Sequence, residues 1–304
     1  MNEYEVIVIG GGPAGLSAAL YLARFDRQVA LFDAGHGRST WHQVAYNYLG
    51  FPGGVRTRRL RELGYEQLAD YPQVHIFRRK IENLRREHNL FFAGVGSEVW
   101  CNRAVILCTG VEDHYPQFKG WEDCIGRSMF WCITCDGYES KGKQVVVVGN
   151  TNDTASIAMQ MQRFTRQVTV VTNSAQNDIS ENFVRRLQLA RIPIIEDRIV
   201  DVEGQEGMVR VIHLQNGARL MVDRLFSHQE PTPQTDLATQ IGVQIAKNGY
   251  ILVDTEQKTS VSGVFAAGDV TRLHSHQIST AVHEGGMAAS AANYYLYPPE
   301  LKDE

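Results

Sequence analysis

The sequence predicts an α/β protein made of two doubly wound, Rossmann-like lobes. The main observation is an internal repeat, in which residues 5–33 and 144–172 align without a gap. Each copy has the pattern of a buried strand, a turn, a helix with apolar residues at helical spacing and a second strand. A glycine-rich turn opens the first helix. Two such βαβ units imply two parallel-sheet lobes.

The composition excludes several classes of protein. A net charge of −4 lacks the basic excess that is usual in nucleic-acid binders, so no nucleic-acid partner is expected. No apolar run is long enough to span a membrane, which leaves peripheral contact as the one open membrane role. The chain opens directly into a strand without a signal peptide, and five cysteines are too few for a disulfide scaffold. We therefore expect a cytoplasmic protein.

The remaining elements follow from local patterns. We expect strands at residues 74–77, 80–85 and 90–93, which together look like a small antiparallel meander, and further strands at 104–107 and 264–267. Residues 210–222 alternate around Gln215-Asn216-Gly217, a strong hairpin signal. Helices are predicted at 58–68, 182–190 and 279–295.

Two junctions divide the chain into its lobes. They are expected near residues 112–114 and 229–234, where Pro231 and Pro233 interrupt regular structure. This places residues 1–112 and 237–304 in one discontinuous lobe. Residues 113–236 then form an inserted lobe.

The first glycine-rich turn has the pattern of a dinucleotide-binding loop, Gly10-Gly11-Gly12-Pro13-Ala14-Gly15. Gly10 permits a tight turn, Gly12 lets a pyrophosphate approach the backbone, and Gly15 allows the helix to pack on the strand. The helix start adds amide donors and partial positive charge. Asp33, at the end of the second strand, is expected to accept a hydrogen bond from a ribose hydroxyl. A glycine turn that serves only packing is the alternative.

Other segments resemble the FAD motifs of the two-lobed flavin disulfide reductases. Residues 264–270, VFAAGDV, resemble the second FAD motif, in which the aspartate holds the ribityl chain; here it is Asp269, after Gly268. Residues 106–110, ILCTG, resemble the ATG motif and end in Thr109 and Gly110, with Cys108 in place of alanine. This resemblance implies that the dinucleotide is FAD.

Two further segments resemble the flavin-side parts of the same family. Asn47 begins the stretch NYLGFP, which is similar to the family's flavin-side loop, with Leu49 where proline is usual. His276, Gln277 and Ile278 resemble the segment that places backbone amides at the flavin pyrimidine ring. Amides there would stabilise negative charge on reduced flavin.

A cysteine pair, Cys132 and Cys135, lies between the two βαβ units. Its CxxC spacing lets two sulfurs reach bonding distance with little rearrangement, and a lowered thiol pKa in such a loop favours exchange. This placement resembles the low-molecular-weight thioredoxin reductase family, whereas glutathione reductase-type enzymes carry their cysteines in the first lobe. The resemblance implies that Cys135 faces the flavin, Cys132 exchanges with the partner and Asp136 manages the thiolate proton.

Zinc binding and a purely structural pair are the alternatives for these cysteines. Four side chains could in principle bind zinc, namely Cys124, Cys132, Cys135 and His114. Their spacing does not match a paired CxxC ribbon, so no metal is expected. The other cysteines, which are Cys101, Cys108 and Cys124, are expected to be inert.

The second copy of the repeat lacks the cofactor positions of the first. Gly10 is matched by Gly149, but Gly12, Gly15 and Asp33 are replaced by threonines, which are Thr151, Thr154 and Thr172. The thioredoxin reductase family carries a His-Arg-Arg cluster after this strand to hold the NADPH 2′-phosphate, whereas residues 172–176 contain no arginine. We therefore predict loss of pyridine nucleotide binding. Arg185 and Arg186 lie further along the chain and are interpreted as solvated charges on a helix. A variant NADPH site with unusual residues is the alternative.

This combination resembles a narrower group, the diflavin-linked disulfide oxidoreductases of photosynthetic bacteria. These keep the CxxC pair, lack the nucleotide motifs and stack a second FAD on the first, with electrons proposed to pass from thiol to flavin. The resemblance implies two FAD per chain. Trp41 and His42 lie in an aromatic stretch before Asn47 and are candidates to contact flavin.

The sequence thus predicts a homodimeric flavin-dependent disulfide oxidoreductase whose substrate is a thioredoxin-like protein or a small thiol. Three alternatives stay open. One is a one-FAD thioredoxin reductase reduced by ferredoxin or another non-nucleotide donor, and another is an NADPH enzyme with a variant site. The third is a non-catalytic redox sensor. The direction of electron flow is not fixed by the sequence.

Overall fold

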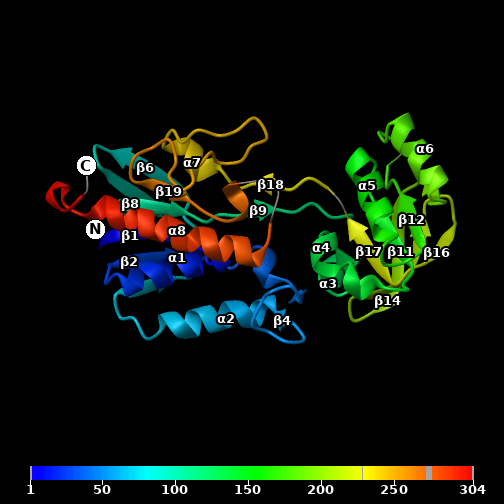
Figure 1. Cartoon of the computed structure of the whole chain (residues 1–304), viewed down its shortest axis with the longest axis horizontal. Helices are drawn as coiled ribbons and strands as arrows, with labels where there is room; N and C mark the ends of the chain where they lie inside the picture. The colour runs from blue at the N-terminus through cyan, green and yellow to red at the C-terminus, as the bar shows by residue number, and fades with distance from the viewer. Residues whose placement is uncertain (1, 175, 228, 272–275, 303–304) are drawn as a thin grey trace. The chain divides into compact units, whose positions relative to one another are not determined.

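The computed structural model describes residues 2–174, 176–227, 229–271 and 276–302, and the chain divides into two compact units (Figure 1). Unit 1 comprises residues 1–40, 57–112 and 231–304, and unit 2 comprises residues 41–56 and 113–230. The chain passes between the units at 112–113 and 230–231, within the two junctions that proline and polar residues indicate. One segment is grouped differently from the sequence-based division, because residues 41–56 belong to unit 2.

Unit 1 is built on a sheet with the strand order β5-β2-β1-β8-β7-β6, and β19 also pairs with β8. Its strands are β1 (Asn2–Ile9), β2 (Val29–Phe32), β5 (Val74–Phe77), β6 (Asn83–Glu87), β7 (Leu90–Val95), β8 (Glu98–Leu107) and β19 (Val264–Ala266). The antiparallel meander is β6-β7-β8, so the prediction that residues 74–77 begin it is wrong. Strand β5 instead pairs in parallel with β2, because a helix crosses over between them.

The helices of unit 1 cover both faces of this sheet. They are α1 (Pro13–Arg24), α2 (Thr57–Leu68), α7 (Asp236–Gln240) and α8 (Ile278–Leu296), with the short 3-10 turns η1 (Arg38–Thr40), η3 (Asp269–Thr271) and η4 (Pro299–Leu301). Val6 and Val8 of β1 face a core shared with α1 and α8, which run side by side in Figure 1. Ile7 and Ile9 face the opposite core. Alternate residues of β1 are therefore buried on opposite faces, as in a doubly wound sheet.

Unit 2 repeats this plan on a smaller scale. Its parallel sheet has the order β10-β17-β11-β12-β13, and β14-β15-β16 form a separate antiparallel sheet. The strands are β10 (Met129–Phe130), β11 (Val145–Val148), β12 (Val168–Val171), β13 (Ile194–Ile195), β14 (Ile199–Gln205), β15 (Met208–Leu214), β16 (Arg219–Met221) and β17 (Arg224–Ser227). The predicted hairpin is confirmed, with β15 and β16 joined through Gly217.

The remaining elements of unit 2 are short, apart from two helices on the parallel sheet. They are β3 (Val44–Ala45), β4 (Val55–Arg56), α3 (Trp121–Cys124), α4 (Ile133–Asp136), η2 (Tyr138–Ser140), α5 (Asn152–Met161) and α6 (Glu181–Leu189). Val145 and Val147 face the core under α5 and α6, whereas Val146 and Val148 face the core that β14 and β15 share. The repeat therefore produces two copies of the same layered unit.

The two passages of the chain near the junctions pair with each other. Strand β9 (Val111–Glu112) and strand β18 (Thr232–Pro233) form an antiparallel ladder that belongs to unit 1. No helix of the described chain is both long and apolar enough to cross a bilayer.

Candidate active site

Three of the predicted FAD segments meet at one edge of the unit 1 sheet. Strands β1, β8 and β19 lie side by side, with Ile9 paired to Leu107 and Leu107 paired to Ala266. The glycine loop follows β1, the Cys108–Gly110 segment follows β8, and Gly268–Asp269 follows β19. Ligands of open α/β sheets bind outside the carboxyl ends of the strands. The fold therefore gathers segments from distant parts of the sequence at a position suited to a cofactor.

The glycine loop has a closed side and an open side. Gly10 has a φ of +121°, and a Cβ there would lie 2.0 Å from Cys108 O. A Cβ at Gly15 would lie 1.8 Å from Gly10 O, so the helix packs directly on the turn. At Gly12, the N-cap of α1, a Cβ would meet no atom within 4 Å. The open side of Gly12, at the start of a helix, fits the approach of a FAD pyrophosphate.

Ala14, in the first turn of α1, is in close contact with the segment that follows β19 and with helix α8. A Cβ at Gly268 would lie 2.9 Å from Ala14 Cβ, and a Cβ at Gly285 of α8 would lie 2.1 Å from Ala14 O. Gly268 N donates to Glu284 Oε2 at 2.8 Å. Pro13 occupies the first turn at no cost, because its missing N–H has no helical partner there. The end of β19 and helix α8 are thus fixed directly against the glycine loop.

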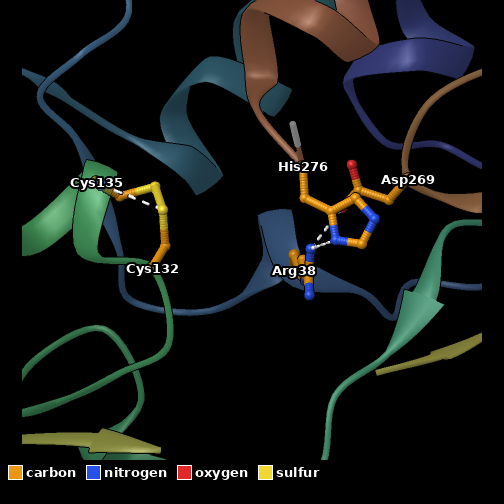
Figure 2. Close-up of a disulfide and its surroundings, with 5 residues drawn as sticks. All are labelled: Arg38, Cys132, Cys135, Asp269 and His276. Atoms are coloured by element: carbon orange, nitrogen blue, oxygen red, sulfur yellow. Dashed lines mark hydrogen bonds and ion pairs between the residues drawn. A yellow bond between two sulfur atoms is a disulfide. The ribbon is translucent and has the colours of Figure 1, made fainter. Parts of the chain in front are cut away.

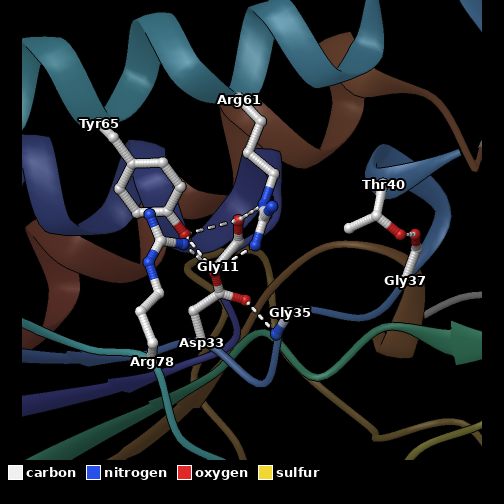
Figure 3. A network of polar contacts seen from close by, with 8 residues as sticks. All are labelled: Gly11, Asp33, Gly35, Gly37, Thr40, Arg61, Tyr65 and Arg78. Carbon is white, nitrogen blue, oxygen red and sulfur yellow. Dashed lines mark hydrogen bonds and ion pairs between the residues drawn. The ribbon is translucent and has the colours of Figure 1, made fainter.

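Asp33 lies at the end of β2 in a dense polar network (Figure 3). Its carboxylate accepts hydrogen bonds from Gly35 N at 2.9 Å and Tyr65 Oη at 2.6 Å, and it forms ion pairs with Arg61 and Arg78. Burial by itself raises the pKa of Asp33, but the hydrogen bonds and the two guanidinium charges outweigh it and hold that pKa below its ordinary value. Asp33 is therefore a fixed anion.

Sequence reasoning missed the three side chains that bind Asp33. Arg61 and Tyr65 lie one turn apart on α2, a spacing that places them on one face, and Arg78 directly follows β5. Arg61 Nε also donates to Gly11 O at 3.0 Å, which brings a positive charge to the glycine loop. The ribose contact of Asp33 stays a prediction.

Asp269, at the end of β19, is held by an arginine that the sequence did not indicate (Figure 2). Arg38 Nη1 lies 2.8 Å from Asp269 Oδ2 and 2.8 Å from His276 Nδ1. Because a guanidinium only donates, His276 Nδ1 is the acceptor in this contact. Gln277 is the N-cap of α8 and Ile278 its first residue, so this predicted segment does open a helix.

Thr109 and Gly110, just after β8, hydrogen-bond to the segment in which the chain returns to unit 1. Thr109 Oγ1 donates to Gln234 O at 2.6 Å, and Gln234 N donates to Gly110 O at 3.0 Å. These bonds tie the end of β8 to the segment that returns from unit 2. Their contact with a cofactor stays a prediction.

Three other predicted cofactor residues belong to unit 2. Trp41 packs against the hydrophobic cluster that contains Tyr115, and His42 Nδ1 lies 3.3 Å from Arg127 Nη2. Asn47 is exposed in the turn after β3. The structure therefore groups Trp41, His42 and Asn47 with the unit that carries the cysteine pair.

Cys132 and Cys135 form a disulfide in unit 2, with their Cα atoms 5.2 Å apart (Figure 2). Cys132 is the N-cap of α4, and its Sγ accepts a hydrogen bond from Cys135 N at 3.2 Å. A backbone amide in this position would stabilise a thiolate on Cys132 after reduction. Gly137 closes the turn, since a Cβ there would lie 2.5 Å from Ile133 O.

Asp136, the residue after Cys135, is buried with 5% of its surface exposed. Burial, together with the charge of Glu139, raises the pKa of Asp136 to about 7, and the charge of Arg224 opposes this shift. A carboxyl that titrates near neutrality can both donate and accept a proton under physiological conditions. The acid/base role that the resemblance implies for Asp136 stays a prediction.

The other cysteines are buried, as expected of inert residues. Burial raises the pKa of the Cys101, Cys108 and Cys124 thiols. Cys124 Sγ donates to Gly120 O at 3.6 Å. Within the described ranges no group of three or more His, Cys, Asp or Glu side chains is arranged to hold a metal ion.

The second loop differs from the first in the hydrogen bonds that its side chains make. Thr151 is the N-cap of α5, and its Oγ1 accepts from Thr154 N at 3.5 Å, whereas α1 has no side-chain cap. Asn150 Nδ2 donates to Asp178 Oδ2 at 2.9 Å. Thr172 is buried and donates to Ser174 O at 2.9 Å; its neighbour Ala175 lies outside the described residues. Three polar groups at this loop, Asn150 Nδ2, Thr154 N and Thr172 Oγ1, are thus hydrogen-bonded within the chain.

The family of this chain follows from its sequence together with this geometry. Residues 4–285 match the pyridine nucleotide-disulphide oxidoreductase family, and the chain belongs to that family. It is a flavin-dependent oxidoreductase of the thioredoxin reductase-like kind, and this family binds FAD.

Similar proteins span the whole chain. A thioredoxin reductase of Listeria innocua is 30% identical, over 99% of this chain and 95% of that protein. A thioredoxin reductase of Treponema pallidum is 28% identical, over 97% of this chain and 98% of that protein. The crystal structure of thioredoxin reductase from Streptococcus pyogenes shares the fold, with a TM-score of 0.89, 24% identity and coverage of 97% of this chain and 98% of that one. The fold is that of low-molecular-weight thioredoxin reductases.

Proposed function

We propose that this protein exchanges two electrons between FAD and the Cys132–Cys135 disulfide without using a pyridine nucleotide. The contrast between its two glycine loops carries the proposal. In unit 1 the backbone at Gly12 faces open space, whereas in unit 2 Thr151 and Thr154 fill the equivalent positions and Thr151 caps the helix. A phosphate would have to displace this cap and approach the first turn, which contains Asp153.

The residues of each unit have distinct roles in this function. FAD, when bound along the Gly10–Gly15 loop, supplies a two-electron couple. Cys132 forms a mixed disulfide with the external thiol, and Cys135 is the cysteine that communicates with the flavin. Asp136 gives a proton to the departing thiolate or takes one from an entering thiol, because its pKa of about 7 permits both.

We propose a thioredoxin-like protein or a small dithiol as the partner, with electrons passing from thiol to flavin. Relatives named thioredoxin reductases support a protein disulfide as the reaction partner. The turn that carries the cysteines is accessible, because Thr134 between them is exposed and Tyr138 after them is 66% exposed. A homodimer in the cytoplasm is part of the same proposal.

The proposal is tested by anaerobic titration of the purified flavoprotein with dithiothreitol and with reduced thioredoxin, following flavin absorbance. We expect the flavin to be reduced by either dithiol and the Cys135→Ser variant to stay oxidised. A flavin that stays oxidised in the unmodified protein with both dithiols would overturn the thiol-to-flavin direction. Normal reduction in Cys135→Ser would overturn the role of the cysteine pair.

We also propose a second FAD in each chain, a finer assignment with separate support. Three of the four tryptophans, Trp41, Trp121 and Trp131, pack around one hydrophobic cluster of unit 2, and Trp131 directly precedes Cys132 in the sequence. Their ring partner Tyr115 lies 5.7 Å from both Trp121 and Trp131 between centroids. Half-buried rings of this kind favour stacking of a planar ligand.

Released FAD should be quantified against chain concentration after denaturation. The expected ratio is two, and Trp41→Ala should weaken the second site by roughly tenfold, in line with the loss of one stacking contact. A ratio of one that does not change on incubation with FAD would favour the one-FAD, nucleotide-independent alternative.

A further inference from the structure

Beside Asp136 lies a second carboxyl group that the reaction described above does not use. Glu139 is three residues further on, in η2, which directly follows α4. Residues at this spacing lie on the same side of a helical turn, with Cβ atoms about 5–6 Å apart. The two acids therefore share one face of the turn that carries the disulfide.

Both carboxyl groups have an oxygen that is buried without a hydrogen bond. Asp136 Oδ2 and Glu139 Oε2 are each inaccessible to solvent and have no hydrogen-bond partner in the described part of the chain. Asp136 is the more deeply buried of the two, since Glu139 is only half-buried. An ionised carboxylate in such a place loses its hydration without compensation.

Two neighbouring carboxylates in a low-dielectric environment do not both ionise readily, so the pair retains a proton. The more buried member, Asp136, is the one that keeps it. The charged groups that act on Asp136 are Glu139 from η2 and Arg224 from β17, with opposite effects. Arg224 is itself engaged elsewhere, because its Nη1 donates to Arg127 O at 2.5 Å and its guanidinium lies 5.1 Å from the Phe130 ring centroid.

We propose that Glu139 is a positioning residue that keeps Asp136 protonated between turnovers and returns protons to it from solvent. This inference rests on the proposed thiol–disulfide function. In the exchange step an external thiolate attacks Cys132 Sγ, the bond between Cys132 and Cys135 breaks, and its electron pair goes to Cys135 Sγ. Asp136 then donates its proton to that sulfur, giving a mixed disulfide at Cys132 and a thiol at Cys135. Glu139 passes one proton from water to the Asp136 carboxylate and restores the starting state.

The charge of Glu139 can be removed, preserved or opposed in matched variants. Glu139→Gln keeps the shape and removes the charge, whereas Glu139→Asp keeps the charge. Arg224→Gln removes the opposing charge. Asp136→Asn removes the titrating group and identifies its signal by difference.

The first measurement is the titration midpoint of Asp136, read by infrared spectroscopy of the full-length flavoprotein labelled with ¹³C-aspartate. Removing a like charge favours ionisation, so Glu139→Gln should lower the midpoint by on the order of one pH unit. Glu139→Asp should return it toward the unmodified value, and Arg224→Gln should raise it.

The second measurement is the rate at which excess dithiothreitol opens the disulfide between pH 5 and 9, by acid quench and alkylation of the freed thiols. The alkaline limb of this pH–rate profile should shift in the same direction as the titration midpoint of Asp136.

An unmoved midpoint and pH profile in Glu139→Gln would overturn this inference, whatever the flavin does. If Glu139→Gln does not fold, an Arg224→Gln midpoint that stays in place or falls would overturn it in the same way. If the midpoint and the opening rate move as expected but no dithiol reduces the flavin, the proposed function fails and the role of Glu139 stands.

Discussion

At the scale of single residues, two glycines of the same loop should respond differently to a side chain. Gly12 has φ −84° and ψ −176°, values that any residue adopts, and a Cβ there meets no atom within 4 Å. Gly12→Val should therefore fold and yet lack flavin, because the branched side chain occupies the approach of the pyrophosphate. The readouts are the flavin-to-protein ratio and the circular dichroism spectrum.

Gly15→Ala is the matched comparison. Its Cβ would lie 1.8 Å from the carbonyl oxygen of Gly10, so the helix or the turn must shift. This variant should lose stability as well as flavin. Full flavin content in soluble Gly12→Val would refute the placement of the cofactor at this loop.

The two cysteines should have unequal roles. Cys132→Ser leaves Cys135 as the thiol assigned to the flavin side, and we expect a long-wavelength thiolate-to-flavin charge-transfer band in its absorption spectrum. Cys135→Ser should lack this band, and both variants should lose dithiol turnover. A band that is present only in Cys135→Ser would reverse the assignment.

Sequence patterns identify residues whose role depends on the backbone, and they miss side-chain partners. The space around Gly10, Gly12 and Gly15 agrees with the roles predicted for them, because a strand–turn–helix motif fixes its own geometry. Arg38 was missed because its partner Asp269 is more than two hundred residues away in the chain. Such contacts depend on packing between distant segments, which no local pattern encodes.

At the scale of elements, the N-termini of α1 and α5 are the informative pair. Helix α5 has a threonine cap and an acidic first turn, whereas α1 has neither. Thr151→Ala should remove the cap at a cost of about 1 kcal/mol, seen as about fivefold faster hydrogen exchange of the first amides of α5. Flavin content and dithiol turnover should not change.

Ser180→Ala in α6 is the control for the cap, because the N-cap Ser180 makes no side-chain cap hydrogen bond that could be lost. The exchange of the first amides of α6 should change little in that variant. If Thr151→Ala left the α5 amides unchanged but impaired turnover, the threonine would belong to a functional nucleotide site and not to a closed one.

The order of elements was largely predictable, but the pairing of one strand was not. The repeat, the hairpin and helices α2, α6 and α8 follow from periodicity and turn residues, and their ends lie within a few residues of the expected ones. Strand β5 was misplaced because four residues, Val74–Phe77, carry no information about direction. The helix that precedes β5 determines its parallel pairing with β2.

At the scale of the whole molecule, the two units divide the chemistry between them. Unit 1 gathers the glycine loop, Asp33 and Asp269, and unit 2 carries the disulfide together with Asp136 and the second loop. The junctions could be predicted because proline and a change of pattern indicate them. The grouping of residues 41–56 with unit 2 could not, since it depends on where Trp41 packs.

The central claim is that electrons reach this flavoprotein from thiols and not from a pyridine nucleotide. Anaerobic stopped-flow spectroscopy of the holoprotein tests it directly, with NADPH, NADH and dithiothreitol mixed separately against the oxidised enzyme. The account predicts that the dithiol bleaches the flavin band within the turnover time, while both nucleotides leave it oxidised. Bleaching by NADPH as fast as by the dithiol would contradict the account and restore an NADPH-dependent thioredoxin reductase.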